Sequence, residues 1–214
     1  MSELLNIKMF KKHQLIRSLE QRGIQPRVLG AFAAVDRADF ISPELEKMAY
    51  DDVPLPIGKG QTISQPYTIA VMLSLLELKQ GQKVLEAGSG SGYVLALLSH
   101  IVEEKGRVFG IEVLSELVKK SRKSLTGSKN IRVYNKNGIH GLKDKAPFDR
   151  IIISAAVNEI PQELLHQLKP KGGILVAPKG SRFEQELIVI ERKDNVFEIK
   201  KRVPGFLFVP FVGE

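Results

Sequence analysis

Residues 83–113 read KVLEAGSGSGYVLALLSHIVEEKGRVFGIEV, and this stretch decides the fold. It opens with a short apolar run that predicts a strand, and the glycines that follow predict a turn. The apolar pattern of 93–104 is that of a helix, and 106–113 returns to the short apolar texture of a strand. A strand, a turn, a helix and a second strand together predict a βαβ unit in a parallel sheet.

The chain downstream of this unit continues the alternation. Residues 148–157 are nearly all apolar, which is typical of a strand buried on both faces. We expect the other elements of the alternation at 114–125 (helix), 130–135 (strand), 160–170 (helix) and 172–178 (strand). Residues 184–203 alternate apolar and polar residues around an Asp-Asn turn and predict a hairpin, and 205–211 is a candidate for one more strand. The predicted class is α/β, with a doubly wound, Rossmann-like sheet of about seven strands whose last strands are antiparallel.

The chain upstream of the unit reads as helical. Leu15 and Leu19 fall at a helix-like interval, and Pro26 suits the first turn of a second helix. A further apolar helix pattern covers 67–78. Before it lies PLPIGKGQTISQPY (54–67), which Pro and Gly interrupt too often for a helix and whose apolar residues do not alternate cleanly enough for a strand. We therefore predict a loop there.

The length of 214 residues predicts a single domain. We expect its parts to be N-terminal helices with the loop (1–60), a cofactor-binding core (61–178) and C-terminal antiparallel strands (179–214).

Composition narrows the class of protein. The chain has 43% apolar residues, no cysteine, no apolar run of the length that spans a bilayer and no signal-peptide pattern, so we expect a cytoplasmic protein with no membrane partner. Its formal net charge is +8, but the basic residues are spread out, which favours a solvated surface over a nucleic-acid site. The four histidines show no metal-ligand spacing, so we expect no metal.

The glycine cluster and two acids indicate a ligand. Ligands of open parallel sheets bind beyond the carboxyl ends of the strands, where the glycines admit them to the backbone. The spacing is G-x-G-x-G, neither the G-x-G-x-x-G of dinucleotide sites nor a P-loop. Glu112 ends the second strand, where an acid accepts hydrogen bonds from ribose, while Glu86 ends the first, where it would repel a phosphate and attract an ammonium. A ligand with ribose, ammonium and no phosphate fits S-adenosylmethionine; the alternative is a surface Glu112 and a Glu86 that only stabilises the following helix.

The predicted cofactor-binding set extends past the third strand. Asn137 and Gly138 lie at its carboxyl end, where the adenine would be, and the Asn amide can hydrogen-bond the base; the alternative is a simple Asn-Gly turn. The full set that we predict is Glu86, Gly88, Ser89, Gly90, Gly92, Glu112, Asn137 and Gly138.

Three segments carry a resemblance to a known family. YDDVPLPIGKGQTISQPYTIAVM (50–72), VLEAGSGSGY (84–93) and APFDRIIISAA (146–156) resemble the protein-L-isoaspartate O-methyltransferases. The resemblance implies a methyltransferase sheet and transfer of a methyl group from S-adenosylmethionine to the α-carboxyl of L-isoaspartyl residues in damaged proteins. Separately from the resemblance, we expect a monomer with no nucleic-acid partner.

The same resemblance assigns residues of the site. The family's active-site serine maps onto Ser64, with Thr62 and Ile63 beside it, and FEQEL (183–187) suggests Gln185 as a further substrate-binding residue. The family's usual Asp-Gly pair is here Asn-Gly, so we expect altered cofactor affinity rather than lost function.

The reaction explains why a hydroxyl-rich loop is useful. A carboxylate with a reference pKa of about 3 to 4 is already ionised and needs no general base. It needs placement, which Ser64 would provide by donating a hydrogen bond, so we expect this serine to be a positioner and not a nucleophile. Two alternatives stay open: a methyltransferase acting on RNA or another substrate, and a relative that binds the cofactor without catalysis.

Overall fold

The computed structural model describes residues 2–211 of the chain. The α-helices are α1 (Ser2–Gln21), α2 (Pro26–Ala34), α3 (Pro66–Leu75), α4 (Tyr93–Val102), α5 (Ser115–Ser124) and α6 (Gln162–His166). Short 3-10 helices are η1 (Arg37–Phe40), η2 (Pro43–Met48), η3 (Gly138–His140) and η4 (Lys143–Lys145). The strands are β1 (Leu55–Gly58), β2 (Gln61–Ile63), β3 (Lys83–Ala87), β4 (Arg107–Glu112), β5 (Ile131–Asn135), β6 (Arg150–Ile153), β7 (Lys171–Gly180), β8 (Gln185–Lys193) and β9 (Val196–Pro204).

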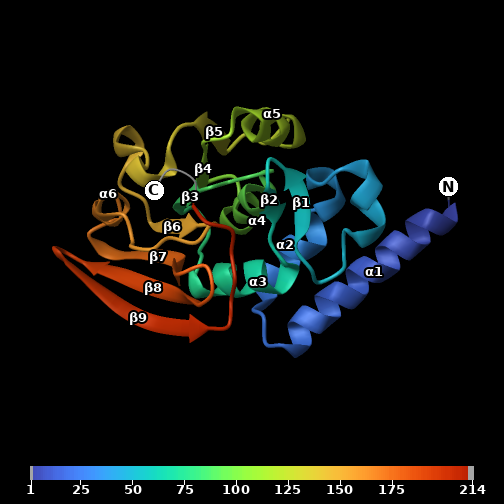
Figure 1. Cartoon of the computed structure of the whole chain (residues 1–214), viewed down its shortest axis with the longest axis horizontal. Coiled ribbons are helices and arrows are strands. Elements are labelled where there is room, and N and C mark those ends of the chain that lie inside the picture. The colour runs from blue at the N-terminus through green and yellow to red at the C-terminus, as the bar shows by residue number, and fades with distance from the viewer. Residues whose placement is uncertain (1, 212–214) are drawn as a thin grey trace.

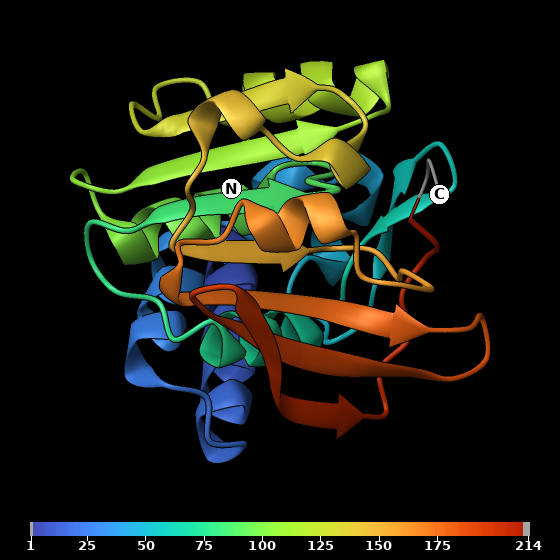
Figure 2. The same cartoon turned by 90° about the vertical axis from the view of Figure 1, so that its left-hand side faces the viewer.

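The main sheet has seven strands in the order β5-β4-β3-β6-β7-β8-β9. Strands β3 to β7 are parallel, and β8 and β9 continue the sheet as antiparallel strands, as Figures 1 and 2 show. The turn between β8 and β9 consists of Asp194 and Asn195, and Asp194 adopts a positive φ of 56°. The predicted α/β sheet with its antiparallel end is therefore confirmed, including the position of the last hairpin.

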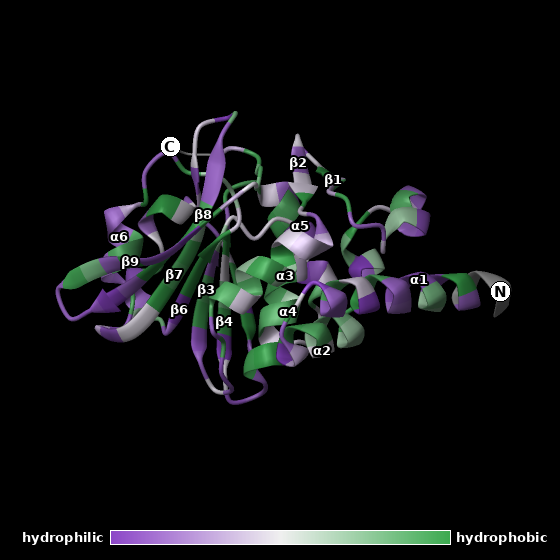
Figure 3. Cartoon of the chain, turned by 90° about the horizontal axis from the view of Figure 1, so that it is seen from below, coloured by the Kyte–Doolittle hydropathy of each residue, from purple (hydrophilic) through white to green (hydrophobic). Residues whose placement is uncertain are grey.

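The sheet is buried on both faces because its strand residues alternate between two hydrophobic clusters. Val84 and Ile152 belong to the cluster that holds helices α1 to α4, whereas Leu85 and Ile151 belong to the cluster that holds α6. In Figure 3 the hydrophobic colour concentrates in the central strands and in α2 to α4, while α5 and much of β9 are hydrophilic. Because both of its faces are covered, such a sheet binds ligands at the ends of its strands.

The segment 54–67, predicted as a loop, contains a small antiparallel hairpin instead. Strands β1 and β2 pair from Leu55↔Ile63 to Gly58↔Gln61, and Lys59 and Gly60 form the turn with φ of 55° and 71°. Two successive positive φ values are the geometry of a tight two-residue hairpin turn. The loop prediction was wrong because the strands are only four and three residues long, too short for alternation to register.

The segment 205–211 is not the further strand that we considered. Its only bridge within residues 2–211 joins Pro210 to Ala156, and the rest runs outside any ladder. Pro204 has no backbone N–H to donate, and Gly205 has a φ of 91°, so regular pairing stops at Pro204. The segment crosses back over the carboxyl ends of the parallel strands, which places it next to the site.

The N-terminal helices form a layer beside the sheet. Pro26 and Pro66 occupy the first turns of α2 and α3, where a missing N–H costs nothing. Helix α1 runs along one side of the molecule and its start projects past the other elements (Figure 1). Residues 2–211 contain no helix that is long and apolar enough to cross a membrane.

Candidate active site

A crevice lies at the carboxyl ends of β3, β4 and β6, beneath the β1–β2 hairpin. It consists of two adjoining cavities, which residues of these strand ends and of the hairpin line together. Residues that line both cavities are Ile57, Thr62, Gly88, Gly90 and Ser154. Because these residues line both, the two cavities lie side by side, and the hairpin forms their outer wall.

The glycine turn after β3 has a conformation that other residues rarely adopt. Gly88, Gly90 and Gly92 have φ of 80°, 50° and 89°. A Cβ on Gly92 would lie 2.5 Å from the Ser121 Oγ, so this glycine lets α4 start close to α5. Gly88 and Gly90 line the crevice itself, and Ser89, between them, is buried. The triplet therefore serves both ligand access and helix packing.

Glu86 is a buried acid at the end of β3. It is 1% exposed, and its Oε1 accepts a hydrogen bond of 2.6 Å from the Ser154 hydroxyl. Its Oε2 has no hydrogen-bond partner within the described residues. Burial, with a smaller contribution from nearby Glu112, raises the pKa of Glu86 to about 8. A cationic group that entered the crevice would satisfy the free oxygen and favour the carboxylate.

Glu112, at the end of β4, is held by the backbone. Its Oε2 accepts from the N–H of Gly90 at 2.8 Å, and its Oε1 accepts from the N–H of Leu114 at 2.9 Å. The carboxylate lines the second cavity with each oxygen retaining acceptor capacity. This rigid acceptor pair suits neighbouring hydroxyl groups such as those of a ribose.

Asn137 and Gly138 divide between two places. Gly138 lines the second cavity, and a Cβ there would lie 2.6 Å from the Phe211 ring. The Asn137 Oδ1 accepts from the N–H of Ile139 at 3.0 Å and so caps η3, and the residue lines a separate outer cleft with His140. Asn137 thus lines the outer cleft, and its side chain orders the backbone of η3, whose first residue, Gly138, lines the second cavity.

The hairpin residues predicted from the sequence lie together above the glycine turn. Thr62 and Ser64 line the inner crevice and also an outer groove that runs past Tyr67. Ile63, between them, is 5% exposed and lines the crevice. Ser64 is half-buried, and its Oγ has no hydrogen-bond partner within residues 2–211. The serine thus stands where the crevice meets the outside.

Gln185 lines neither the crevice nor the outer groove. It is 5% exposed, its Nε2 donates to the carbonyl of Phe208 at 3.3 Å, and its Oε1 accepts from the N–H of the same residue at 2.7 Å. Phe208 lines both the inner crevice and the outer groove. Gln185 can therefore affect a substrate through the segment that it holds.

Sequence reasoning missed the segment 208–211 as part of the site. Val209, Pro210 and Phe211 line the second cavity, and the Phe211 ring packs 3.6 Å from the position of a Cβ on Gly88. No motif marks these residues, since apolar residues near a chain end look like core.

No group of three or more His, Cys, Asp or Glu that could hold a metal ion occurs within residues 2–211.

Comparisons with known proteins agree on one family. The model of the protein-L-isoaspartate(D-aspartate) O-methyltransferases matches residues 10–214. A protein-L-isoaspartate O-methyltransferase of Methanothrix thermoacetophila is 40% identical over 206 residues, which are 95% of this chain and 96% of the relative. A solved protein-L-isoaspartate O-methyltransferase superimposes with a TM-score of 0.86 at 26% identity, over 94% of this chain and 66% of the other. A Plasmodium falciparum structure described as a beta-aspartate methyltransferase in complex with S-adenosyl-L-homocysteine superimposes with a TM-score of 0.82 at 27% identity, over 94% and 98%.

Proposed function

The chain belongs to the protein-L-isoaspartate(D-aspartate) O-methyltransferase family, and from this premise we propose which of its residues carry the reaction. The enzyme transfers a methyl group from S-adenosylmethionine to the α-carboxyl of L-isoaspartyl residues in damaged proteins, which starts their repair. When bound, S-adenosylmethionine supplies an electrophilic methyl carbon on a positively charged sulfur. A carboxylate oxygen bonds to that carbon while the carbon–sulfur bond breaks and its electron pair stays on sulfur, so no proton moves.

The crevice has the hydrogen-bond acceptors and the open backbone that this cofactor needs. The unpartnered Oε2 of Glu86 accepts the ammonium of the methionine part, which restores the negative charge that burial suppresses. Glu112 accepts hydrogen bonds from the ribose, because two backbone N–H groups already fix its orientation. Gly88 and Gly90 let the cofactor approach the backbone, and Gly138 leaves room at the adenine end. Ser89 and Gly92 complete the turn without touching the reacting atoms.

Ser64 is the residue that we assign to the acceptor carboxylate. Its position between the inner crevice and the outer groove is the single observation that carries the proposal. The residues that line both the groove and the inner cavity are Thr62, Ser64 and Phe208, and of these Ser64 and Thr62 carry hydroxyl groups that an incoming isoaspartyl carboxylate meets. The free Ser64 hydroxyl donates a hydrogen bond that orients the carboxylate without removing a proton.

The outer groove suits a stretch of polypeptide beside the damaged residue. Apolar side chains form much of its wall, and Tyr67, Phe206 and Leu207 are among them. The exposed Arg182 stands at the groove and has no ion-pair partner within residues 2–211. We assign the groove to residues that flank the isoaspartate, with an acidic residue favoured near Arg182.

We also propose a monomer that acts in the cytoplasm and binds no nucleic acid. The crevice and the groove are lined by residues of one chain, so a second copy is not required for a complete site. Exposed carboxylates pair many of the basic residues, such as Lys193 with Glu198 at 2.7 Å, which reduces their attraction for a phosphate backbone. Sedimentation of the purified chain tests the monomer, and a binding assay with RNA at low salt tests the absence of a nucleic-acid partner.

The experiment that tests the function is methyl transfer to a matched pair of peptides. One peptide carries L-isoaspartate and the other carries normal aspartate at the same position. We expect labelling of the isoaspartyl peptide and at most trace labelling of its twin. Equal labelling of both, or none of either, would refute the proposed function.

A further inference from the structure

Arg37 is a buried cation whose bonds converge on the active-site hairpin. Its side chain is 0% exposed, at the start of η1. One guanidinium nitrogen donates to the carbonyls of Ala49 and Asp51 at 3.0 Å and 3.3 Å. The other donates to the carbonyls of Val53 and Ser64 at 3.0 Å and 3.1 Å.

This arrangement is costly for a residue that only fills the core. Asp51 and Asp52 lie near enough to favour the cation electrostatically, but neither carboxylate accepts a hydrogen bond from it. A buried charge that hydrogen-bonds only neutral groups loses hydration that those groups replace only in part. The hydrogen-bond acceptors of Arg37 within residues 2–211 are all backbone carbonyls, and its Nε has no partner. An apolar side chain of similar volume would pack there without that cost, so the guanidinium has a role beyond burial.

The two carbonyls on one nitrogen flank the hairpin. Val53 lies just before β1 and Ser64 lies just after β2, so a single NH₂ group ties the two ends of the hairpin together. A second tie lies next to it, because the Asp52 carboxylate accepts from the N–H of Tyr67 at 2.8 Å. The N-terminal layer therefore holds the chain on both sides of Ser64.

The tip of the hairpin is held much less firmly than its base. Lys59 pairs with Glu116 at 2.8 Å, but both side chains are at least half exposed, and such pairs contribute little. The only other tie to α5 among the described contacts is a 3.3 Å hydrogen bond from Lys120 to the carbonyl of Ile57. A hairpin with a firm base and a weakly held tip can admit ligands while its base stays in place.

We propose that Arg37 is a positioning residue that fixes the backbone of Ser64 by clamping both ends of the hairpin. The inference rests on the proposed function, because it concerns how the acceptor serine is placed. It also gives the N-terminal layer a part in the reaction: the layer supplies the clamp and does not only cover the sheet.

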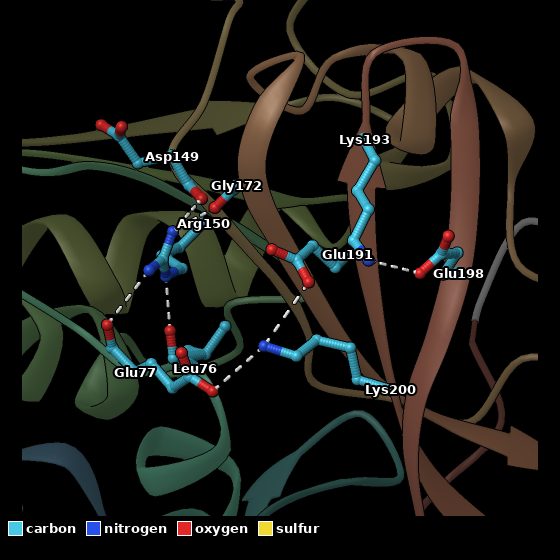
Figure 4. Close-up of polar contacts among 9 residues, drawn as sticks. All are labelled: Leu76, Glu77, Asp149, Arg150, Gly172, Glu191, Lys193, Glu198 and Lys200. Atoms are coloured by element: carbon cyan, nitrogen blue, oxygen red, sulfur yellow. Dashed lines mark hydrogen bonds and ion pairs between the residues drawn. The ribbon is translucent and has the colours of Figure 1, made fainter.

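Arg150 provides a matched control. It too is a buried guanidinium, 6% exposed, and donates only to backbone carbonyls, those of Leu76, Glu77, Asp149 and Gly172. Arg150 begins β6, at the amino ends of the parallel strands and opposite the crevice. Figure 4 shows its bonds near the ion pairs of Lys193 with Glu198 and of Lys200 with Glu191. Losing this arginine measures the cost of a buried guanidinium that is remote from the crevice.

The test compares Arg37→Lys with Arg150→Lys. A lysine keeps the charge but concentrates its donors at one point, so it cannot span carbonyls on two sides. For each variant we would measure Tm, the Kd of S-adenosylhomocysteine, and kcat and KM on the isoaspartyl peptide at a temperature where it is folded. We expect both variants to lose Tm, but only Arg37→Lys to lose about 100-fold in kcat/KM, mainly in kcat, as displaced reacting groups do. The Kd should change by less than about threefold in both, because neither arginine contacts the crevice.

Three outcomes would overturn the inference. The first is an equal change in kcat/KM for the two variants. The second is a Kd of S-adenosylhomocysteine that rises in Arg37→Lys enough to account for its loss of activity. If Arg37→Lys does not fold, Arg37→Gln, which keeps two N–H donors, replaces it. The third outcome is that Arg37→Lys and Arg37→Gln both fail to fold while Arg150→Lys folds, which would assign Arg37 to the fold alone. A wild-type enzyme that fails to label the isoaspartyl peptide refutes the proposed function instead, so the two failures are distinguishable.

Discussion

Buried polar groups are hydrogen-bonded at the amino ends of the parallel strands, whereas some of those at the carboxyl ends are not. At the amino end, Arg150 places four hydrogen bonds on carbonyls, and the carboxylate of Asp149 accepts from Lys83 and Lys169. At the carboxyl end, Glu86 and Ser89 each keep a buried oxygen without a partner within residues 2–211. Buried polar atoms are normally paired, and because Glu86 also lines the crevice, its unpaired oxygen indicates a place that a ligand completes. One end is built for stability and the other for binding.

The largest expected effect is that of a substitution at Glu86, which tests whether the carboxyl end of the strands binds the cofactor. We expect Glu86→Gln to weaken S-adenosylhomocysteine binding by about 100-fold, because a hydrogen bond to a charged group contributes about 1.5–3 kcal/mol. Calorimetric titration measures the change. The control is Asp149→Asn at the amino end, which should lower Tm and leave Kd unchanged, since its carboxylate bonds only protein groups. An unchanged Kd for Glu86→Gln would mean that the ammonium does not bind there.

Ser64 tests the carboxyl end from the side of the acceptor. We expect Ser64→Ala to lower kcat on the isoaspartyl peptide by about 20-fold, the loss of one hydrogen bond to a charged group, with the cofactor Kd unaltered. Steady-state kinetics and titration separate the two quantities. Ser74→Ala is the matched control, because the Ser74 hydroxyl only donates to the carbonyl of Ala70 within α3. A full rate in Ser64→Ala would remove this serine from the mechanism.

The pH dependence sharpens the comparison, because it reports the unpaired acid. Below its folded pKa of about 8, Glu86 holds a proton and offers no charge to the ammonium. The affinity for S-adenosylhomocysteine should therefore rise about tenfold between pH 6.5 and pH 8, and Glu86→Gln should abolish that rise. A flat wild-type profile would contradict the assignment.

The same group makes a linked prediction for stability without ligand. The folded pKa of Glu86 lies above the ordinary value of 4.5, so the folded state holds a proton that the unfolded state releases. Its contribution to stability is present below pH 4.5 and is lost as pH rises to about 8. Urea unfolding of the wild type and of Glu86→Gln across this window should show a smaller decline in the variant.

The smallest effect concerns the groove outside the carboxyl end. We expect Arg182→Ala to reduce the preference for an isoaspartyl peptide with a flanking Asp over one with a flanking Lys by about threefold, as an exposed ion pair contributes about 0.2–1 kcal/mol. The ratio of kcat/KM for the two peptides measures it. Lys201→Ala, an exposed basic residue on β9 outside the groove, should leave the ratio unchanged. A preference that survives in Arg182→Ala would place its source elsewhere.

Local patterns predicted the sheet well and the elements around it less well. The βαβ unit at 83–113 and the Asp194-Asn195 hairpin were correct because periodicity and turn residues encode them within a few positions. The β1–β2 hairpin was missed, and 205–211 was a candidate strand that the structure does not contain, because short or proline-broken segments take their conformation from what they pack against.

The sequence by itself predicted the class of sheet, the glycine turn, and Glu86 and Glu112 as residues suited to the cofactor, whereas Ser64 came from the resemblance to the family. The sheet, the turn and the two acids follow from patterns that neighbouring residues carry, and from strand ends that must meet at one edge. Only the tertiary structure decided that Arg37 clamps the hairpin ends and that Phe211 closes the crevice over Gly88. The physical reason is separation along the chain: contacts between distant residues depend on how whole elements pack, and no local pattern encodes that packing.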